Sequence, residues 1–189
     1  MLNFSNHYQP MLLINAAVVA PIFLLIFAGI VLTKKQKNWL NLLTWALLLI
    51  YLYLLFDVTI FPINWIFANS TLLKNGFGQQ QVMTNFNLLE IFSYRSSQVW
   101  GNLLLLMPFT FLIALLNAKF ANFKAALIIA FGTSSIIELS QLIMNYFYLG
   151  NRIFDLNDLI LNTLGGLIGY CLLRIVFNLF PRLPTAIRK

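Results

Sequence analysis

Long apolar runs separated by short polar breaks dominate the pattern along this chain. The runs last roughly twenty residues, which is the length that an α-helix needs to cross the hydrocarbon core of a membrane. Strands that cross a membrane are about ten residues long and alternate in polarity, so this pattern excludes a membrane β-barrel. We therefore predict an all-α polytopic transmembrane helical bundle of about five spanning helices, at residues 11–32, 39–61, 100–117, 125–148 and 158–180.

The breaks between the runs assign the helix ends to two sides of the membrane. The short gaps 33–38 and 118–124 make the helices that they join antiparallel neighbours. The longer segments 62–99 and 149–157 then lie on the opposite side, where 62–99 forms a long outer loop. The sequence contains no internal repeat that we detect, so residues 1–189 are treated as a single transmembrane domain.

The positive charges predict the orientation of these helices. Cytoplasmic loops retain an excess of Lys and Arg. One side carries only Lys74, Arg95 and Arg152, and the other carries Lys34, Lys35, Lys37, Lys119, Lys124, Arg182, Arg188 and Lys189. We therefore expect a multi-pass protein of the cell membrane with its N-terminus outside and its C-terminus in the cytoplasm.

Composition strengthens the membrane assignment. Of the 189 residues, 60% are hydrophobic and 9% are charged, and a water-soluble domain of this size could not hide so much apolar surface. The net charge of +7 fits this topology and contact with anionic lipids, and we expect no nucleic-acid partner. The single cysteine, Cys171, lies within an apolar run and has no partner in the chain for a disulfide bond.

The acidic residues are few and avoid the cytoplasmic side. Asp57, Glu90, Asp155 and Asp158 fall toward the outer face, whereas Glu138 falls near the middle of the membrane. An ionisable side chain at that depth costs at least ~2.5 kcal/mol, so Glu138 requires a partner, a cavity or a proton. Glu138 is therefore the first candidate for a functional residue.

Helical spacing groups the polar residues into two stripes. On the fourth helix the spacings of four, three and four residues relate Ser134, Glu138, Gln141 and Asn145. On the fifth, spacings of three, four, three and four relate Asp155, Asp158, Asn162, Gly165 and Gly169. Glycines four residues apart let two helix backbones approach closely, so this face is expected to pack against another helix, in the same chain or in a second copy. We predict that the two stripes meet.

The residues near Asp155 also have structural interpretations. Asp155 could be the N-cap of its helix, with Asp158 three residues later completing a capping-box-like start. Both carboxylates are also favoured by the positive end of the helix dipole. Arg152 could neutralise one of the two aspartates across the short outer loop.

The deeper polar residues also have structural alternatives. Glu138 could be a hydrogen-bonded packing residue that holds Asn102 or Asn162 between helices, because polar pairs stabilise membrane bundles modestly. Gln141 and Asn162 could act in the same way. Pro108 is expected to kink the third helix rather than to shape a site.

Several motifs occur in an order typical of a known family. The strongest is NRIFDLND at residues 151–158, which continues through NTLGG at 162–166 to GY at 169–170. Supporting segments are TIFPI at 59–63, GNLL at 101–104 with MP at 107–108, and IELSQ at 137–141. On these motifs the chain resembles the VanZ-like family of small bacterial membrane proteins.

The resemblance has two departures and limited functional content. Glu90 stands where the family's outer-loop pattern has proline, and Thr110 stands where the family usually has glycine after Pro108. The resemblance implies a bacterial cell-membrane protein associated with resistance to the glycopeptide antibiotic teicoplanin. It does not imply a particular biochemical activity.

Our leading hypothesis is engagement of a lipid-linked or lipid-tailed cell-envelope molecule at the outer face. A lipid-tailed glycopeptide or a lipid-linked envelope precursor would then be the partner, together with membrane lipids. The candidate ligand-binding residues are Asn102, Glu138, Gln141, Arg152, Asp155, Asp158 and Asn162.

Two alternatives use the same residues. The first is an intramembrane enzyme in which Glu138 transfers protons or in which Asp155 and Asp158 hold a divalent cation; these three are the candidate catalytic residues. The second is a small proton-coupled transporter or flippase, which a dimer through Gly165 and Gly169 would enlarge. The sequence identifies no resident metal site and no cofactor.

Overall fold

The structure, a computed structural model, describes residues 12–33, 38–65, 84–150 and 152–188. Five helices in these ranges are long and apolar enough to cross a membrane, which confirms the predicted fold class. The long helices are α1 (Ala20–Thr33), α2 (Trp39–Thr59), α4 (Ser96–Leu116), α5 (Phe123–Tyr146) and α6 (Leu156–Leu179). The 3-10 helices are η2 (Ala16–Val18), η3 (Leu88–Ser93) and η4 (Ala118–Phe120), and the short α7 (Leu183–Arg188) follows α6.

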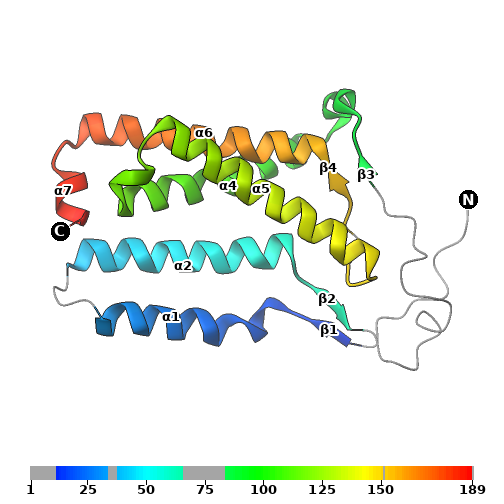
Figure 1. Ribbon diagram of the computed structural model, residues 1–189, viewed down its shortest axis with the longest axis horizontal. Coiled ribbons are helices and arrows are strands. Elements are labelled where there is room, and N and C mark those ends of the chain that lie inside the picture. Colours follow the sequence, from blue (N-terminus) through cyan, green and yellow to red (C-terminus); the bar gives the residue numbers. More distant parts are fainter. Residues whose placement is uncertain (1–11, 34–37, 66–83, 151, 189) are drawn as a thin grey trace, which may run out of the picture.

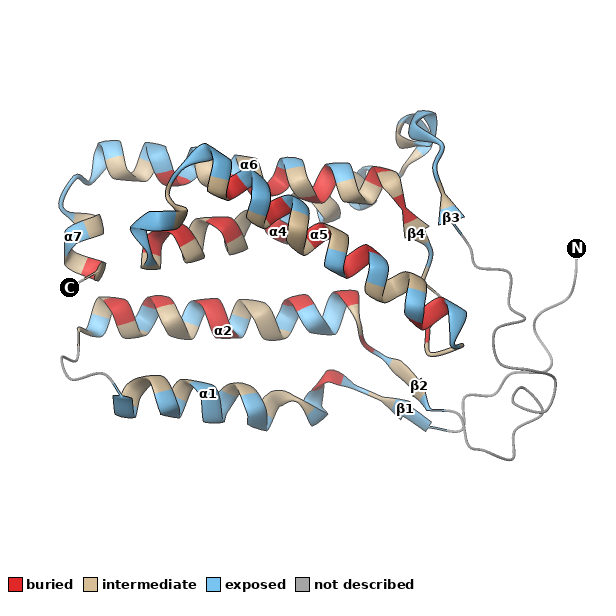
Figure 2. Cartoon of the chain, in the orientation of Figure 1, coloured by how far each residue is buried: buried red, intermediate tan, exposed pale blue. Residues whose placement is uncertain are grey.

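Helix α6 lies at the centre of the packing (Figure 1). It packs most extensively against α4 and then against α5, whereas α2 joins this group through α4 and α1 packs on α2. Figure 2 shows the consequence, because buried residues recur along α2, α4, α5 and α6 but are missing from α1. Large exposed side chains such as Leu24, Leu25 and Leu32 therefore present apolar surface of the kind that lipid covers.

The first spanning segment was predicted to start too early. Leu12–Ile14 forms strand β1, which pairs antiparallel with β2 (Ile63–Trp65), and α1 begins only at Ala20 after η2. A short apolar run has the same composition in a strand and in a helix, so hydrophobicity alone could not separate them. Part of the predicted loop 62–99 is likewise ordered, with β2, β3 (Thr84–Asn85) and η3, whereas residues 66–83 lie outside the described ranges.

The short helix α7 was not predicted and closes one end of the bundle. Ile187 is buried against Ala114, Leu115 and Leu173. The Arg188 guanidinium donates to the carbonyl oxygens of Ala114 (2.6 Å) and Leu115 (3.1 Å). These carbonyls belong to the last turn of α4, where no intrahelical N–H remains to bond them.

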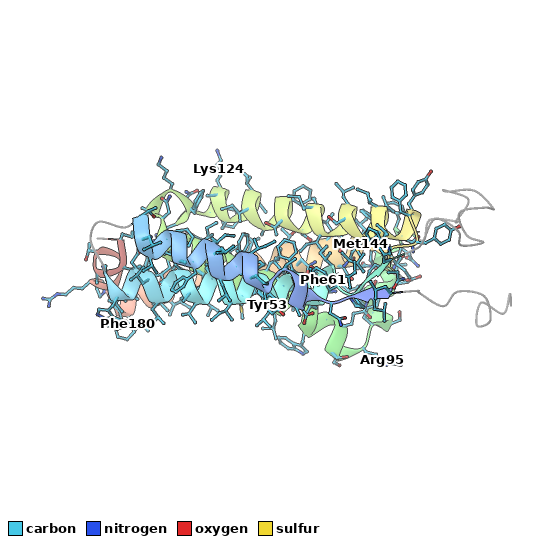
Figure 3. All side chains as sticks on the ribbon, turned by 90° about the horizontal axis from the view of Figure 1, so that it is seen from below. Tyr53, Phe61, Arg95, Lys124, Met144 and Phe180 are labelled. Carbon is cyan, nitrogen blue, oxygen red and sulfur yellow. The ribbon has the colours of Figure 1, made fainter. Side chains whose placement is uncertain are left out.

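Charge is segregated between the two ends of the bundle. Lys119, Lys124, Arg182 and Arg188 lie at the end where α4 turns into α5 and α6 turns into α7. Figure 3 shows Lys124 and Phe180 toward this end, with Arg95 and Met144 toward the other. The carboxylates of Asp57, Glu90, Asp155 and Asp158 belong to segments at that other end, as the sequence predicted.

Candidate functional site

Asp155 caps the N-terminus of α6. Its backbone is extended, and its Oδ1 accepts a hydrogen bond of 2.8 Å from the N–H of Asn157, two residues into the helix. The structural interpretation of Asp155 as an N-cap is therefore confirmed. Asp158 does not complete a capping box, because Oε2 of Glu138, from α5, accepts the Asp155 N–H at 3.0 Å. In a capping box the side chain of the third helical residue accepts the N–H of the cap. Here Glu138, which belongs to a neighbouring helix, accepts it instead.

The second carboxylate oxygen of Asp155 is held by the outer loop. Strand β3 pairs in parallel with β4 (Phe154–Asp155), which places Asn85 opposite Asp155. The Asn85 amide donates to Oδ2 of Asp155 at 3.1 Å, and the Tyr94 hydroxyl donates to the same oxygen. Partial burial, and then the hydrogen bond to Asp155, raise the pKa of Tyr94 to about 12. The hydroxyl therefore stays protonated at physiological pH and can donate this hydrogen bond.

Asn157 ties the start of α6 to the same loop. Its side chain is 1% exposed and donates to the carbonyl of Asn87 at 2.9 Å and to the Tyr94 hydroxyl at 3.3 Å. Sequence reasoning missed Asn85, Asn87, Tyr94 and Asn157 as parts of this network. Asn157 lies within the family-like motif at residues 151–158, whereas Asn85, Asn87 and Tyr94 lie in a loop without helical periodicity.

Asp158 links α6 to α4 rather than to α5. The Asn102 amide of α4 donates to Oδ1 of Asp158, so two of the predicted ligand-binding residues do lie together. Asp158 is also partly exposed. Of Glu138, Asp155 and Asp158, it is therefore the carboxylate that an approaching molecule can reach.

Glu138 is almost fully buried between α5 and α6, with 1% exposure. Its contact with Asp155 and the hydrogen bond of 3.4 Å from the Ser134 hydroxyl to the Leu159 carbonyl confirm that the two polar stripes meet. Glu138 is thus a hydrogen-bonded packing residue between helices, as one interpretation held, but its partner is the Asp155 N–H; Asn102 bonds Asp158 instead, and no hydrogen bond joins Glu138 to Asn162 within the described ranges.

Gln141 and Arg152 form a separate group at the end of α2. The Gln141 amide donates to the carbonyl of Thr59 at 3.1 Å, and the Arg152 guanidinium donates to those of Val58 (2.8 Å) and Phe61 (3.5 Å). These carbonyls are at a helix C-terminus and need such donors. The expectation that Arg152 neutralises an aspartate is therefore wrong. Gln141 and Arg152 remain predicted ligand contacts, but within the described ranges no hydrogen bond joins them to the Asp155 network.

The glycine face of α6 packs within the chain. A Cβ on Gly165 would meet the backbone of Leu103, and one on Gly169 would meet the backbone of Met107. The close approach predicted for these glycines is thus made with α4. The surface that the sequence offered for a contact between two copies through Gly165 and Gly169 is already covered inside one copy.

Thr110, the departure on α4, fits this packing. It is 2% exposed, and its hydroxyl donates to the carbonyl of Gly166 at 2.6 Å. The larger side chain therefore adds a hydrogen bond between α4 and α6 instead of separating them. Glu90, the other departure, is exposed and accepts a hydrogen bond of 2.8 Å from Asn85.

The aspartate pair does not have the arrangement expected for a site that holds a divalent metal ion. Both oxygens of Asp155 already accept hydrogen bonds, one from Asn157 and the other from Asn85 and Tyr94. Across the described ranges, no group of three or more His, Cys, Asp or Glu residues is placed to hold a metal ion.

Comparison with known proteins gives one result. A family model described as VanZ/LLP1 matches residues 48–178. The matched region runs from the middle of α2 to the last turn of α6. It therefore contains every residue of the polar cluster, which consists of Asn85, Tyr94, Asn102, Glu138, Asp155, Asn157 and Asp158. Neither the curated proteins nor the solved structures that were compared with the chain gave a match.

Proposed function

The chain belongs to the VanZ/LLP1 family, and from that premise we propose that it engages a lipid-linked or lipid-tailed cell-envelope molecule at the outer face of a bacterial cell membrane. The proposal includes a contribution to resistance against teicoplanin-type glycopeptides. One observation carries it: the polar cluster lies at a single end of the bundle and reaches the surface at Asp158. Membrane lipids and one such amphiphilic molecule would be the partners.

The surroundings of Asp158 suit a molecule with a polar head and an apolar tail. Asp158 sits in the first turn of α6, and Asn102 sits in the second turn of α4. Farther along the same two helices, apolar side chains such as Leu104 (50% exposed) and Leu164 (46% exposed) lie on the surface of the bundle. A head at Asp158 would thus have its tail along α4 and α6, within the hydrocarbon.

The outward direction of the cluster rests on charge. Lys119, Lys124, Arg182 and Arg188 mark the opposite end, and an excess of basic residues is typical of the cytoplasmic side. The polar cluster would then face outward, where a glycopeptide or an envelope precursor is met.

Resistance in cells tests this function. We expect Asp158→Asn to bind the head about tenfold more weakly, because a hydrogen bond to a charged group contributes about 1.5 kcal/mol, and to lower teicoplanin resistance where the intact chain confers it. Asp57→Asn is the matched control, since Asp57 is an exposed carboxylate in a segment at the same end. Undiminished resistance in the Asp158 variant, at equal amounts in the membrane, would contradict the proposed site.

Glu138 supports a second candidate function, an intramembrane enzyme that uses it as a proton-transfer group. The carboxylate is buried, and within the described ranges only Oε2 accepts a hydrogen bond, which leaves Oε1 available. Such an enzyme should convert its substrate in detergent without a gradient, and Glu138→Gln should abolish conversion. A transporter or flippase would instead show activity only in sealed proteoliposomes.

A further inference from the structure

Free hydrogen-bond acceptors gather where α4, α5 and α6 meet. Oδ1 of Asn162 is buried without a hydrogen-bond partner in the described part of the chain, and Asn162 is 1% exposed. Oε1 of Glu138 also accepts no hydrogen bond there, although Glu138 is equally buried. Because a buried polar atom without a partner costs about 1–3 kcal/mol, the Asn162 oxygen calls for a donor, and Oε1 of Glu138 can accept a second N–H of the same group.

The two free oxygens belong to one region. Asn162 follows Asp158 by four residues, so both lie on one face of α6. The Cα–Cβ bond of a helical residue tilts toward the helix N-terminus, and this tilt aims the Asn162 side chain back toward the turn that holds Asp155 and Asp158. Glu138 reaches the same turn from α5. Asp158 is partly exposed, so a ligand would contact it first, whereas Glu138 and Asn162 are buried.

The region also gathers three carboxylates that have no positive partner within the described ranges. Glu138 lies within the electrostatic reach of both Asp155 and Asp158. In the described ranges these three carboxylates accept hydrogen bonds from backbone N–H groups, side-chain amides and the Tyr94 hydroxyl, which are all neutral donors. The cation next to this segment, Arg152, bonds carbonyls of α2 instead. A charged carboxylate is costly to bury unless it is paired, so a cation that reaches the site would stabilise the charged form of these groups.

We propose that the head group bound at this site is a primary ammonium, which supplies positive charge to Asp158 and N–H donors to Glu138 and Asn162. The inference rests on the proposed function and narrows it, because it selects lipid-tailed molecules with a free amine. A quaternary ammonium brings charge but no N–H. A phosphate brings negative charge and no donor of the required kind, so the carboxylates repel it.

Three amphiphiles with one tail test this selectivity. The full chain, purified in a maltoside detergent, is mixed with dodecylamine, dodecyltrimethylammonium or dodecyl phosphate at equal concentrations, and thermal unfolding is followed. Ligands that bind the native state alone raise the unfolding temperature. We expect a saturable rise with dodecylamine, less with the quaternary amine and none with the phosphate. An equal rise with the quaternary amine, or a larger one with the phosphate, would overturn the proposal.

Two variants separate the site from general adsorption of the amine. Asn162→Leu removes the buried free oxygen and is expected to fold, since it replaces an unpaired polar group by an apolar one of similar size. It should reduce the dodecylamine response, and Asp158→Asn should reduce it further, whereas Asp57→Asn should respond as the intact chain does. A response unchanged in both site variants would contradict the assignment.

Failure of this inference is distinguishable from failure of the proposed function. If Asp158→Asn lowers resistance but dodecylamine does not stabilise the intact chain, the function stands and the head group has another chemistry. If dodecylamine binds through Asp158 and Asn162 while resistance is unaffected, the amine site stands and the proposed function is wrong.

Discussion

Asp155 and Asp158 show how two carboxylates three residues apart acquire different roles. Asp155 has both oxygens engaged by the helix start and the outer loop. Asp158 accepts the Asn102 amide from α4 and stays partly exposed. The first is therefore a structural residue, and the second is the one that an approaching ligand can reach.

This difference predicts a large effect on stability for substitution of Asp155 and a small one for substitution of Asp158. Asp155→Ala should lower the free energy of unfolding by about 1–2 kcal/mol, because it removes an N-cap and the acceptor of Tyr94. Asp158→Asn keeps an oxygen for Asn102 and should change stability far less. Reversible unfolding in mixed micelles measures both values. A larger loss in the Asp158 variant would contradict the assignment of roles.

Tyr94 gives a prediction for alkaline pH. Its pKa is raised from 10.0 to about 12 in the folded chain, so the folded state favours the protonated hydroxyl. This contribution to stability is fully present below about pH 10 and is lost as pH rises through about 12. The stability difference between the intact chain and Tyr94→Phe should therefore be constant up to about pH 10 and shrink above it. A difference that grows with pH would show that the sign is wrong.

At the scale of elements, α6 is positioned by its lack of side chains on one face. Gly165 and Gly169 let the backbone of α4 approach closely, and Thr110 then bonds the carbonyl of Gly166 across the interface. The same interface fixes how far along the helix axis Asp158 lies relative to Asn102, which donates a hydrogen bond to it. Packing of the two helices and geometry of the site are therefore coupled.

Substitution at Gly165 tests this coupling. Gly165→Ala would place Cβ against the backbone of Leu103, and such overpacking costs about 1–3 kcal/mol. Gly132→Ala in α5 is the control, because its Cβ would meet no atom within 4 Å. We expect a lower unfolding temperature in detergent for the first variant and an equal or higher one for the second. Equal temperatures for both would refute close packing at Gly165.

At the scale of the whole molecule, the separation of charge predicts the orientation in the membrane. In a Cys171→Ser background, Glu90→Cys should react with an impermeant thiol reagent in intact cells, and Lys119→Cys should react only after permeabilisation. Both positions are exposed, so the reagent can reach each side chain on its own side. The reverse pattern of labelling would place the polar cluster in the cytoplasm and contradict the proposed function.

The sequence by itself determined the five spans, their antiparallel order and the gathering of acids at one end. These properties depend on hydrophobicity, run length and charge, which are local to each segment. The same locality explains why the sequence could offer Asp155 as an N-cap, because a cap needs only its own first turn.

Only the tertiary structure decided which polar groups meet. Glu138 bonds the Asp155 N–H, Asp158 bonds Asn102, and Arg152 turns to the end of α2. Each pairing depends on the rotation and crossing of two helices, and spacing along one helix does not fix these. Asn85 and Tyr94 come from a loop whose path the strand pairing β3–β4 sets. The helical periodicity of the sequence therefore predicted which faces are polar, whereas the packing between helices determined which residues form hydrogen bonds with one another.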